Sequence, residues 1–327
     1  EVYNRLSVLV AQAEDGSFVE SNADVRRAAD EALGGIELAR IFYSVLETAF
    51  FGLSLGSVLA LVAIGLTITF GVMGVINMAH GELMMLGAYT TYVVQLLMPG
   101  HLDLSILVAI PAAFLVAGSA GVLIERTIIR FLYGRPLETL LATFGVSLVL
   151  QQLVRTVFSP NNRPVVTPTW MSGSLQINEA FSLTYNRLYI VLISLVVFAV
   201  LLAVFKHTRI GLDIRAVSQN RFMARALGVR SQWVDAMTFG LGSGIAGVAG
   251  VALSQISNVG PNLGQSYIID SFMVVVFGGV GNIWGTLIGG MSLGIVNKVL
   301  EPFAGAVLGK IFVLVAVILF IQRRPKG

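Results

Sequence analysis

Three polar side chains lie close together between two long apolar stretches, at a spacing that would let them bind one polar solute. Asn77, His80 and Glu82 belong to the glycine-containing segment 71–82, and apolar runs precede and follow it. If these runs cross a bilayer, such costly polar groups should face a cavity or a polar partner. We predict that they line a solute path; the alternative is that they bond the freed backbone of a broken helix.

A second polar set lies in the other glycine-rich interruption, residues 258–282. Broken hydrophobic segments, one in each half of a chain, are the best sequence indication of a transporter's substrate path. We predict that this set also lines the path, with its amides at the outer mouth; the alternative is that these amides merely solvate a loop. The members of this set are Asp270, Ser271, Asn258, Asn262 and Gln265.

The sequence predicts no catalytic site, no metal site and no bound cofactor. The absence of cysteine excludes disulfides, thiolate metal ligands and cysteine nucleophiles. Residues 305–310 resemble a phosphate-binding loop, but three residues separate the glycines in place of four, and Ile311 replaces the Ser or Thr. We therefore expect this chain to hydrolyse no ATP.

The elements that position these residues must lie in lipid. The chain is 56% hydrophobic and 12% charged, with a mean hydropathy of +0.83, and so little charge cannot coat a soluble particle of 327 residues. The net charge of +3 comes with basic residues placed in loops, so we expect no nucleic-acid partner.

Apolar runs long enough to cross about 30 Å of hydrocarbon follow residue 48. Each must be a helix, because open strands leave backbone groups unpaired in lipid. We predict an all-α, polytopic transmembrane bundle of eight or nine membrane segments, with broken or re-entrant helices, forming one permease domain over residues 49–327. The expected segments are 49–70, 81–98, 105–124, 137–158, 187–205, 233–256, 268–280, 284–300 and 308–322.

Residues 1–48 differ in composition from the rest of the chain. Residues 24–33 are charged and favour a helix, and Gly34-Gly35 should end it. We predict a short helical segment in water, on the extracytoplasmic side.

Basic residues in the loops define the expected orientation. Lys and Arg concentrate in the cytoplasmic loops of membrane proteins, and the predicted spans place three basic groups on one face. The N-terminus is then outside and the C-terminus inside. The groups are Arg126, Arg130 and Arg135; Lys206 to Arg230; and Arg323, Arg324 and Lys326.

The loop 206–230 contains a short predicted helix. Asn220 can cap its N-terminus, Gly228 suits the position after its end, and Ala224 and Leu227 lie between them. Such a helix could dock a cytoplasmic partner or rest on anionic lipid.

Glycines recur every fourth residue in the second half of the chain. This spacing gives a helix a smooth face against which another backbone packs closely. We predict helix packing, within the subunit in preference to between subunits, at Gly240 and Gly244 and at Gly281, Gly285 and Gly289.

Several of these stretches resemble the branched-chain amino acid and urea type permeases of ABC importers. Residues 74–82, residues 238–247 and residues 278–286 are similar to that family's shared blocks. Residues 133–143, 258–267 and 300–310 resemble the urea branch in particular. The resemblance covers about residues 45–327.

The resemblance implies a permease subunit of the bacterial inner membrane that forms the translocation path for urea. It implies a homologous second permease subunit, two cytoplasmic ATPases that use ATP and Mg, and an extracytoplasmic solute-binding protein, besides membrane lipid. It also implies that residues 206–230 are the ATPase-coupling loop. Two alternatives remain open: a permease for branched-chain or other amino acids, and a passive urea channel.

Overall fold

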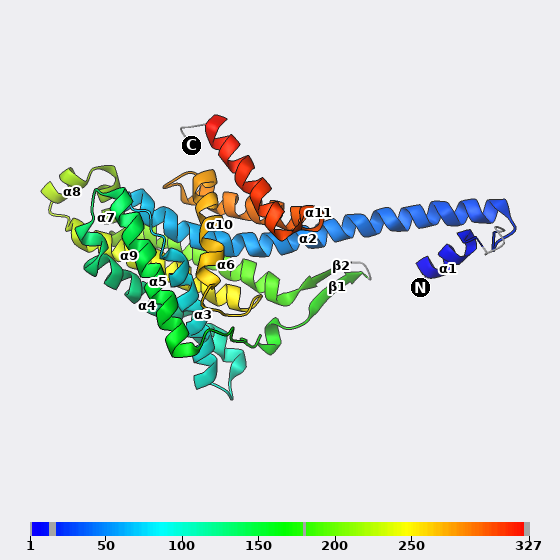
Figure 1. The fold of residues 1–327 in the computed structure, drawn as a ribbon, viewed down its shortest axis with the longest axis horizontal. Helices are drawn as coiled ribbons and strands as arrows, with labels where there is room; N and C mark the ends of the chain where they lie inside the picture. Colours follow the sequence, from blue (N-terminus) through cyan, green and yellow to red (C-terminus); the bar gives the residue numbers. More distant parts are fainter. Residues whose placement is uncertain (1, 13–17, 179–180, 324–327) are drawn as a thin grey trace.

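The computed structural model describes residues 2–12, 18–178 and 181–323, and this part of the chain is a bundle of helices with one small hairpin (Figure 1). Its elements are α1 (Val2–Val10), α2 (Ala23–Met73), α3 (His80–Leu97), α4 (Leu102–Thr127), η1 (Ile129–Phe131), α5 (Pro136–Phe158), η2 (Thr169–Met171), β1 (Ser174–Asn178), β2 (Phe181–Thr184), α6 (Tyr185–His207), α7 (Arg209–Gln219), α8 (Arg221–Ala226), α9 (Ser231–Ser254), α10 (Leu263–Gly278) and α11 (Ile283–Arg323).

The predicted all-α membrane bundle is confirmed. Among the described residues, six helices are long and apolar enough to cross a membrane, and α10 is a shorter apolar helix. Every predicted segment falls largely on a helix, and α11 contains two of them because it bends at Gly305, whose φ of 75° is not helical. Arg324 and Lys326 of the last basic group lie outside the described residues.

The N-terminal segment differs from the prediction. Gly34-Gly35 does not end a helix, because α2 continues through both glycines and through residue 48 for 51 residues. At about 1.5 Å per residue its length is about 75 Å, and its first half projects far beyond the bundle (Figure 1). α1 folds back on this projection, where the Tyr3 hydroxyl donates to Glu37 at 2.9 Å.

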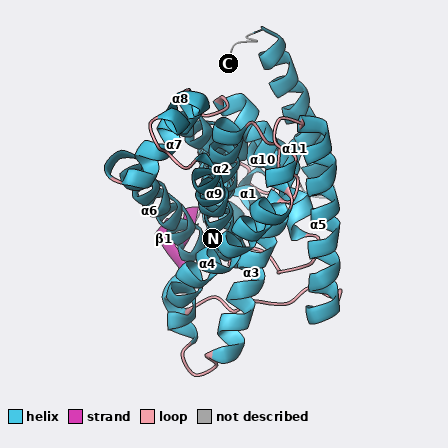
Figure 2. Ribbon diagram, turned by 90° about the vertical axis from the view of Figure 1, so that its left-hand side faces the viewer, coloured by secondary structure: helices cyan, strands magenta, loops and turns pink. Residues whose placement is uncertain are grey.

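The centre of the bundle is α9, which is buried along most of its length between α2, α3 and α4 (Figure 2). Paired glycines allow these crossings: Gly65 of α2 lies against Gly242, and Gly87 of α3 against Gly247. A side chain at any of these positions would collide with the opposing backbone, so the crossings depend on the absent Cβ.

The predicted glycine faces are found in part. Gly240 lies against Val122 of α4, Gly244 against Phe114 of α4, and Gly285 and Gly289 against the end of α10. Gly281 is not on a helix face, because it lies in the turn before α11 with a φ of 81°, which favours glycine.

A β-hairpin, which the sequence did not predict, stands beside the projecting half of α2. Strands β1 and β2 pair antiparallel, and the Phe181 ring stacks on Tyr43 of α2 with their centroids 6.0 Å apart. The hairpin therefore braces the projection where it leaves the bundle.

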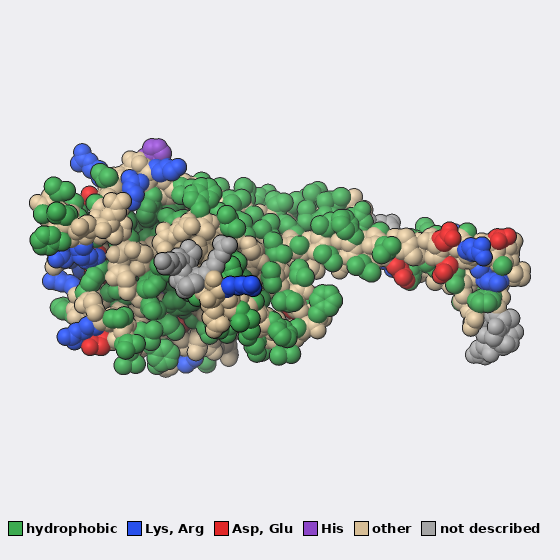
Figure 3. All heavy atoms as spheres, turned by 90° about the horizontal axis from the view of Figure 1, so that it is seen from above, with side chains coloured by type: hydrophobic (Ala, Val, Ile, Leu, Met, Phe, Trp, Pro, Cys, Tyr) green, Lys and Arg blue, Asp and Glu red, His purple; other side chains and the backbone are tan. Residues whose placement is uncertain are grey.

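The two ends of the molecule differ in charge and in elements. α7 and α8 lie at the end opposite the projection of α2 (Figure 1), and Lys and Arg side chains gather at that end (Figure 3). The sides of the bundle between the two ends are covered mainly by hydrophobic side chains (Figure 3).

Candidate functional site

The connection between α2 and α3 turns back into the interior of the bundle. α2 ends at Gly74, which has a φ of 67° and donates its N–H to Phe70 at 2.8 Å. At the start of α3, His80 Nε2 lies 3.1 Å from the Val62 carbonyl. Val62 is eleven residues before Met73, or about 16 Å along α2. Helix α3 therefore begins well inside the bundle, after six residues that are not helical.

Side chains bond the backbone of this break. The Ala79 N–H donates to Asn77 Oδ1 at 3.0 Å, and the Met78 N–H donates to Thr143 Oγ1 of α5 at 3.1 Å. For the side-chain oxygen of Asn77, the alternative stated above therefore holds: it bonds the freed backbone of the broken helix. Its Nδ2 atom is buried and has no hydrogen-bond partner within the described chain.

Glu82 is the centre of a buried polar cluster between α3 and α5. Its Oε1 atom accepts hydrogen bonds from Ser147 Oγ at 3.1 Å and from Gln151 Nε2 at 2.8 Å. Its Oε2 atom is buried and has no partner in the described part of the protein. A buried carboxylate with half of its acceptor capacity unused is costly, so this oxygen is a candidate ligand for a solute.

The face of α5 that supports Glu82 was missed from the sequence. Thr139, Thr143, Ser147 and Gln151 are all buried and recur every four residues, so they share one face of the helix. The recurrence of four polar residues within an apolar span is the signal that identifies this face.

Together these groups suit a small solute that carries both donors and acceptors. Glu82 Oε2 can accept a hydrogen bond and Asn77 Nδ2 can donate one. Both lie near the first turn of α3, and a helix N-terminus favours negative charge. An amide or a zwitterion carries the donors and acceptors that these two unpartnered atoms lack.

The second predicted polar set has other partners. Asp270 of α10 pairs with Lys310 of α11 at 2.6 Å, and Gln265 lines the same hollow of about 510 Å³. Ser271 donates to the Tyr267 carbonyl at 2.9 Å. Asn262 accepts a hydrogen bond from Arg155 at 2.7 Å, and Asn258 lines a separate hollow. The polar residues thus divide among several places rather than forming one path lining.

The structure has the predicted short helix in the loop 206–230. Asn220 Oδ1 accepts a hydrogen bond from the Met223 N–H at 3.0 Å, and Gly228 follows α8 with a φ of 89°. Ala224 packs in a small core with Ile214 and Val234, which fixes α8 against α7 and α9. Leu227 is 86% exposed at the tip of the loop.

A further ionic contact, also missed from the sequence, joins α8 to the bundle. Arg221 donates from both terminal nitrogens to Asp235 of α9, at 2.8 and 2.7 Å, and it also bonds the Tyr133 hydroxyl. Burial and then the charge of Asp235 raise the pKa of Tyr133. Burial lowers the pKa of Arg221, but the contacts with Asp235 and Tyr133 outweigh it, so the pKa is raised overall. One guanidinium therefore connects α8, α9 and the turn before α5.

Comparisons with known proteins find similarity to transport permeases over nearly the whole chain. The family described as branched-chain amino acid transport system / permease component matches residues 48–322. The high-affinity branched-chain amino acid transport system permease protein BraD of Pseudomonas aeruginosa is 32% identical over 302 residues, which cover 87% of this chain and 95% of that protein. The permease protein LivH of Escherichia coli is 32% identical over 297 residues, 88% of this chain and 96% of that protein. The ribose import permease protein RbsC of Haemophilus influenzae is 25% identical over 254 residues, 75% of this chain and 74% of that protein. No solved structure matches the chain.

Proposed function

Because the chain belongs to the family of branched-chain amino acid transport system permease components, we propose that it forms the translocation path of an importer for a branched-chain amino acid. The observation that carries this proposal is the similarity over 87% of the chain to a permease of that transport class. The chain is a multi-pass membrane protein, and we place it in the bacterial inner membrane.

The proposed solute differs from the one expected from the sequence. The resemblance of residues 258–267 and 300–310 to a urea branch finds no support among the relatives, whose names specify branched-chain amino acids or ribose. The amino acid alternative fits them better. A zwitterion also suits the break at α3, where a free carboxylate oxygen and a helix N-terminus offer opposite charges to its two ends.

The proposed path passes the break between α2 and α3. Glu82 and Asn77 each present an unpartnered polar atom there, and Ser147 and Gln151 hold Glu82 from α5. In this proposal a change in the tilt of α5 alters the position of the Glu82 carboxylate, so solute binding and helix movement are coupled. Asp270 and Lys310 lie apart and would brace the bend in α11.

The proposed partners follow from the family and from the exposed tip at α8. Phe222 in α8 and Leu227 directly after it are 80% and 86% exposed, and α8 lies at the end of the bundle that gathers Lys and Arg. We propose that this apolar tip docks a cytoplasmic ATPase subunit that supplies the hydrolysis of ATP. A second permease subunit and an extracytoplasmic solute-binding protein would complete the importer, with the projection of α2 on the extracytoplasmic side.

Reconstitution tests the proposed solute. Liposomes containing this chain with its second permease and its ATPases, given the binding protein, should accumulate labelled leucine only in the presence of ATP. Excess unlabelled urea should not compete. Accumulation of urea without leucine would contradict the proposal, and rapid urea equilibration by this chain alone would favour the passive channel.

A further inference from the structure

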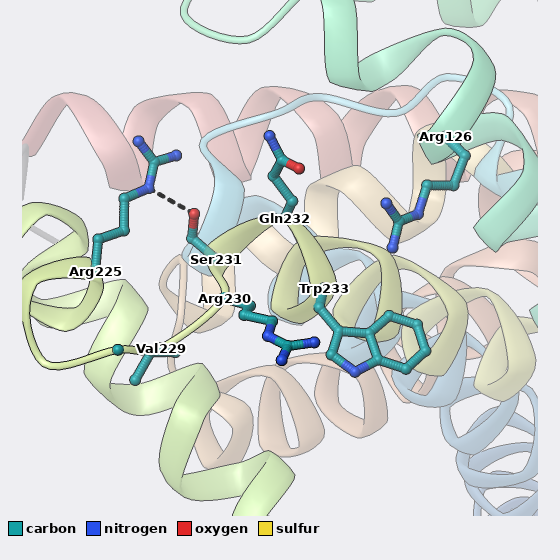
Figure 4. A pocket seen from close by; sticks show the side chains of 8 residues that line it. Arg126, Arg225, Val229, Arg230, Ser231, Gln232 and Trp233 are labelled. Carbon is teal, nitrogen blue, oxygen red and sulfur yellow. Dashed lines mark hydrogen bonds between the residues drawn. The ribbon is translucent and has the colours of Figure 1, made fainter.

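A hollow rich in arginine opens at the basic end of the bundle. Its volume is about 650 Å³, and Figure 4 shows its side chains coming from the end of α4, from α8 and from the start of α9. The arginines that line it are Arg126, Arg225 and Arg230.

Much of the hydrogen-bonding capacity around this hollow is unused. Arg225 donates to Ser231 at 2.6 Å, and Arg126 lies 3.7 Å from the carboxylate of Glu125. The Arg230 side chain makes no hydrogen bond or ion pair within the described residues. No described side chain caps α9, and its first residues, Ser231 and Gln232, line the hollow. Trp233 is 54% exposed beside Arg126, whose guanidinium lies 5.8 Å from its ring centroid (Figure 4). Arginines and a helix N-terminus suit a phosphate group, and an exposed tryptophan suits the interface between headgroups and hydrocarbon.

A second hollow lies deeper between α4, α6 and α9. It has a volume of about 500 Å³, and only apolar residues line it, among them Leu115 of α4, Val200 of α6 and Leu241 of α9. Along α9, Leu241 is eight residues from Trp233, or about 12 Å. This depth lies within one leaflet of a bilayer whose hydrocarbon core is about 30 Å thick.

The two hollows lie along the same faces of two antiparallel helices. From Ser231 to Leu241 the accessible residues of α9 are Gln232, Trp233, Met237 and Leu241, and the last three recur every four residues. On α4, Leu115, Ser119, Val122 and Arg126 recur at intervals of four, three and four and are all at least partly exposed. Gly240 against Val122 and Gly244 against Phe114 show that these helices run antiparallel. Both faces therefore lead from the arginines to the apolar hollow.

We propose that this pair of hollows is a binding site for one anionic phospholipid. The headgroup phosphate lies at Arg126, Arg230 and the start of α9, and one acyl chain follows Met237 into the hollow lined by Leu115, Val200 and Leu241. The positive charge selects an anionic over a zwitterionic headgroup, and the apolar hollow selects a lipid over a free phosphate ion. The site is independent of the transported solute.

Fluorescence of Trp233 tests this site in the full chain. Replacement of Trp170 and Trp284 by Phe leaves Trp233 as the sole tryptophan of the three in the chain. The protein is placed in zwitterionic bilayers containing a small fraction of brominated phosphatidylglycerol or, separately, the same fraction of brominated phosphatidylcholine. Quenching should be stronger with the anionic lipid. R126Q or R230Q should each weaken its apparent affinity about fivefold, the effect of one basic residue near an anionic surface.

Matched variants test the binding of the headgroup and the binding of the acyl chain separately. R130Q, which removes an exposed arginine outside the hollow, should keep the preference. Val200→Phe should weaken quenching by filling the deep hollow, whereas Leu192→Phe, on the same helix outside it, should not. Equal quenching by the two lipids, or a preference that survives R126Q and R230Q together, would overturn the proposal. Relief of quenching by inorganic phosphate would also overturn it, because the hollow would then be a site for a free anion. Relief of quenching by added partner subunits would overturn it too, because the hollow would then be a protein interface.

Discussion

At the scale of single residues, the buried carboxylate of Glu82 depends on α5 for its hydrogen bonds. Among the described residues only its Oε1 atom has hydrogen-bond donors, and both donors come from residues 65 and 69 positions away in the sequence. Such a pairing depends on the fold, so it could not be predicted from the segment 71–82 alone. The polar residues of that segment could be predicted, because polar groups between apolar spans are rare.

Replacing Gln151 with Leu tests this dependence. The change removes the shorter of the two hydrogen bonds to Glu82 Oε1, while Ser147 still donates to that atom. It should lower the free energy of unfolding by about 0.5–1.5 kcal/mol, the net contribution of a typical hydrogen bond. Thermal unfolding in detergent measures the effect. Gln152→Leu is the control, because Gln152 lies on the exposed side of the same helix. Equal melting temperatures for the two variants would show that the hydrogen bond to Glu82 adds nothing.

At the scale of elements, Arg221 makes α8 part of a connected unit. It bonds Asp235 at the start of α9 and Tyr133 in the turn before α5, and α5 in turn holds Glu82. A force applied to α8 therefore has a route to the proposed solute site through packed and hydrogen-bonded elements.

Breaking the link should uncouple the importer without releasing the ATPase. Arg221→Gln should keep the exposed tip of α8 and so retain bound ATPase subunits, yet it should lose most solute-stimulated ATP hydrolysis, because Asp235 loses its bidentate partner. Gly228→Val should instead release the ATPase, because a β-branched residue adopts a φ of 89° only at a cost of about 1–2 kcal/mol. Co-purification and ATPase assays distinguish the two.

The control for this pair is Arg209→Gln, which removes an exposed charge from α7. It should change neither binding nor stimulation. If Arg221→Gln leaves stimulation intact, α8 transmits force by its apolar packing alone; if Gly228→Val retains full ATPase binding, the docking role of the loop is wrong.

Local rules predicted some elements and failed for others. The cap at Asn220 and the left-handed turn at Gly228 were predicted because each depends on a few adjacent residues. The stop at Gly34-Gly35 was wrong because a glycine costs a helix only about 1 kcal/mol, which the propagation of a long helix offsets. The pair Asp270–Lys310 was missed because the two residues are 40 positions apart in sequence and meet only when α11 bends back at Gly305.

At the scale of the whole molecule, the two ends are chemically distinct. The basic end carries α7 and α8, and the other end carries the projection of α2. The bundle itself could be predicted from composition, because lipid allows little besides helices. The projection and the hairpin could not, because both lie outside the apolar runs on which that prediction rests.

The proposed orientation predicts which end a membrane-impermeant thiol reagent reaches. The chain has no cysteine, so Glu31→Cys and Leu227→Cys each introduce one exposed thiol, at opposite ends of the molecule. In spheroplasts the reagent should label Glu31→Cys directly, and Leu227→Cys only after permeabilisation, because the proposed orientation places the basic end in the cytoplasm. Labelling of both from the same side would contradict this orientation, because it requires an even number of membrane crossings between residues 31 and 227.

Because α2 is continuous, it also fixes the direction in which its N-terminal end faces around the helix axis. Because residues 41–48 are helical throughout, removing one residue there would rotate the entire N-terminal end, with the attached α1, by about 100° about the helix axis and draw it in by about 1.5 Å. Removing seven would restore its facing to within about 20° while shortening it by about 10 Å. The number of residues in the projection therefore sets two things at once: how far its N-terminal end reaches and in which direction around the helix axis that end faces. The length and the direction cannot vary independently.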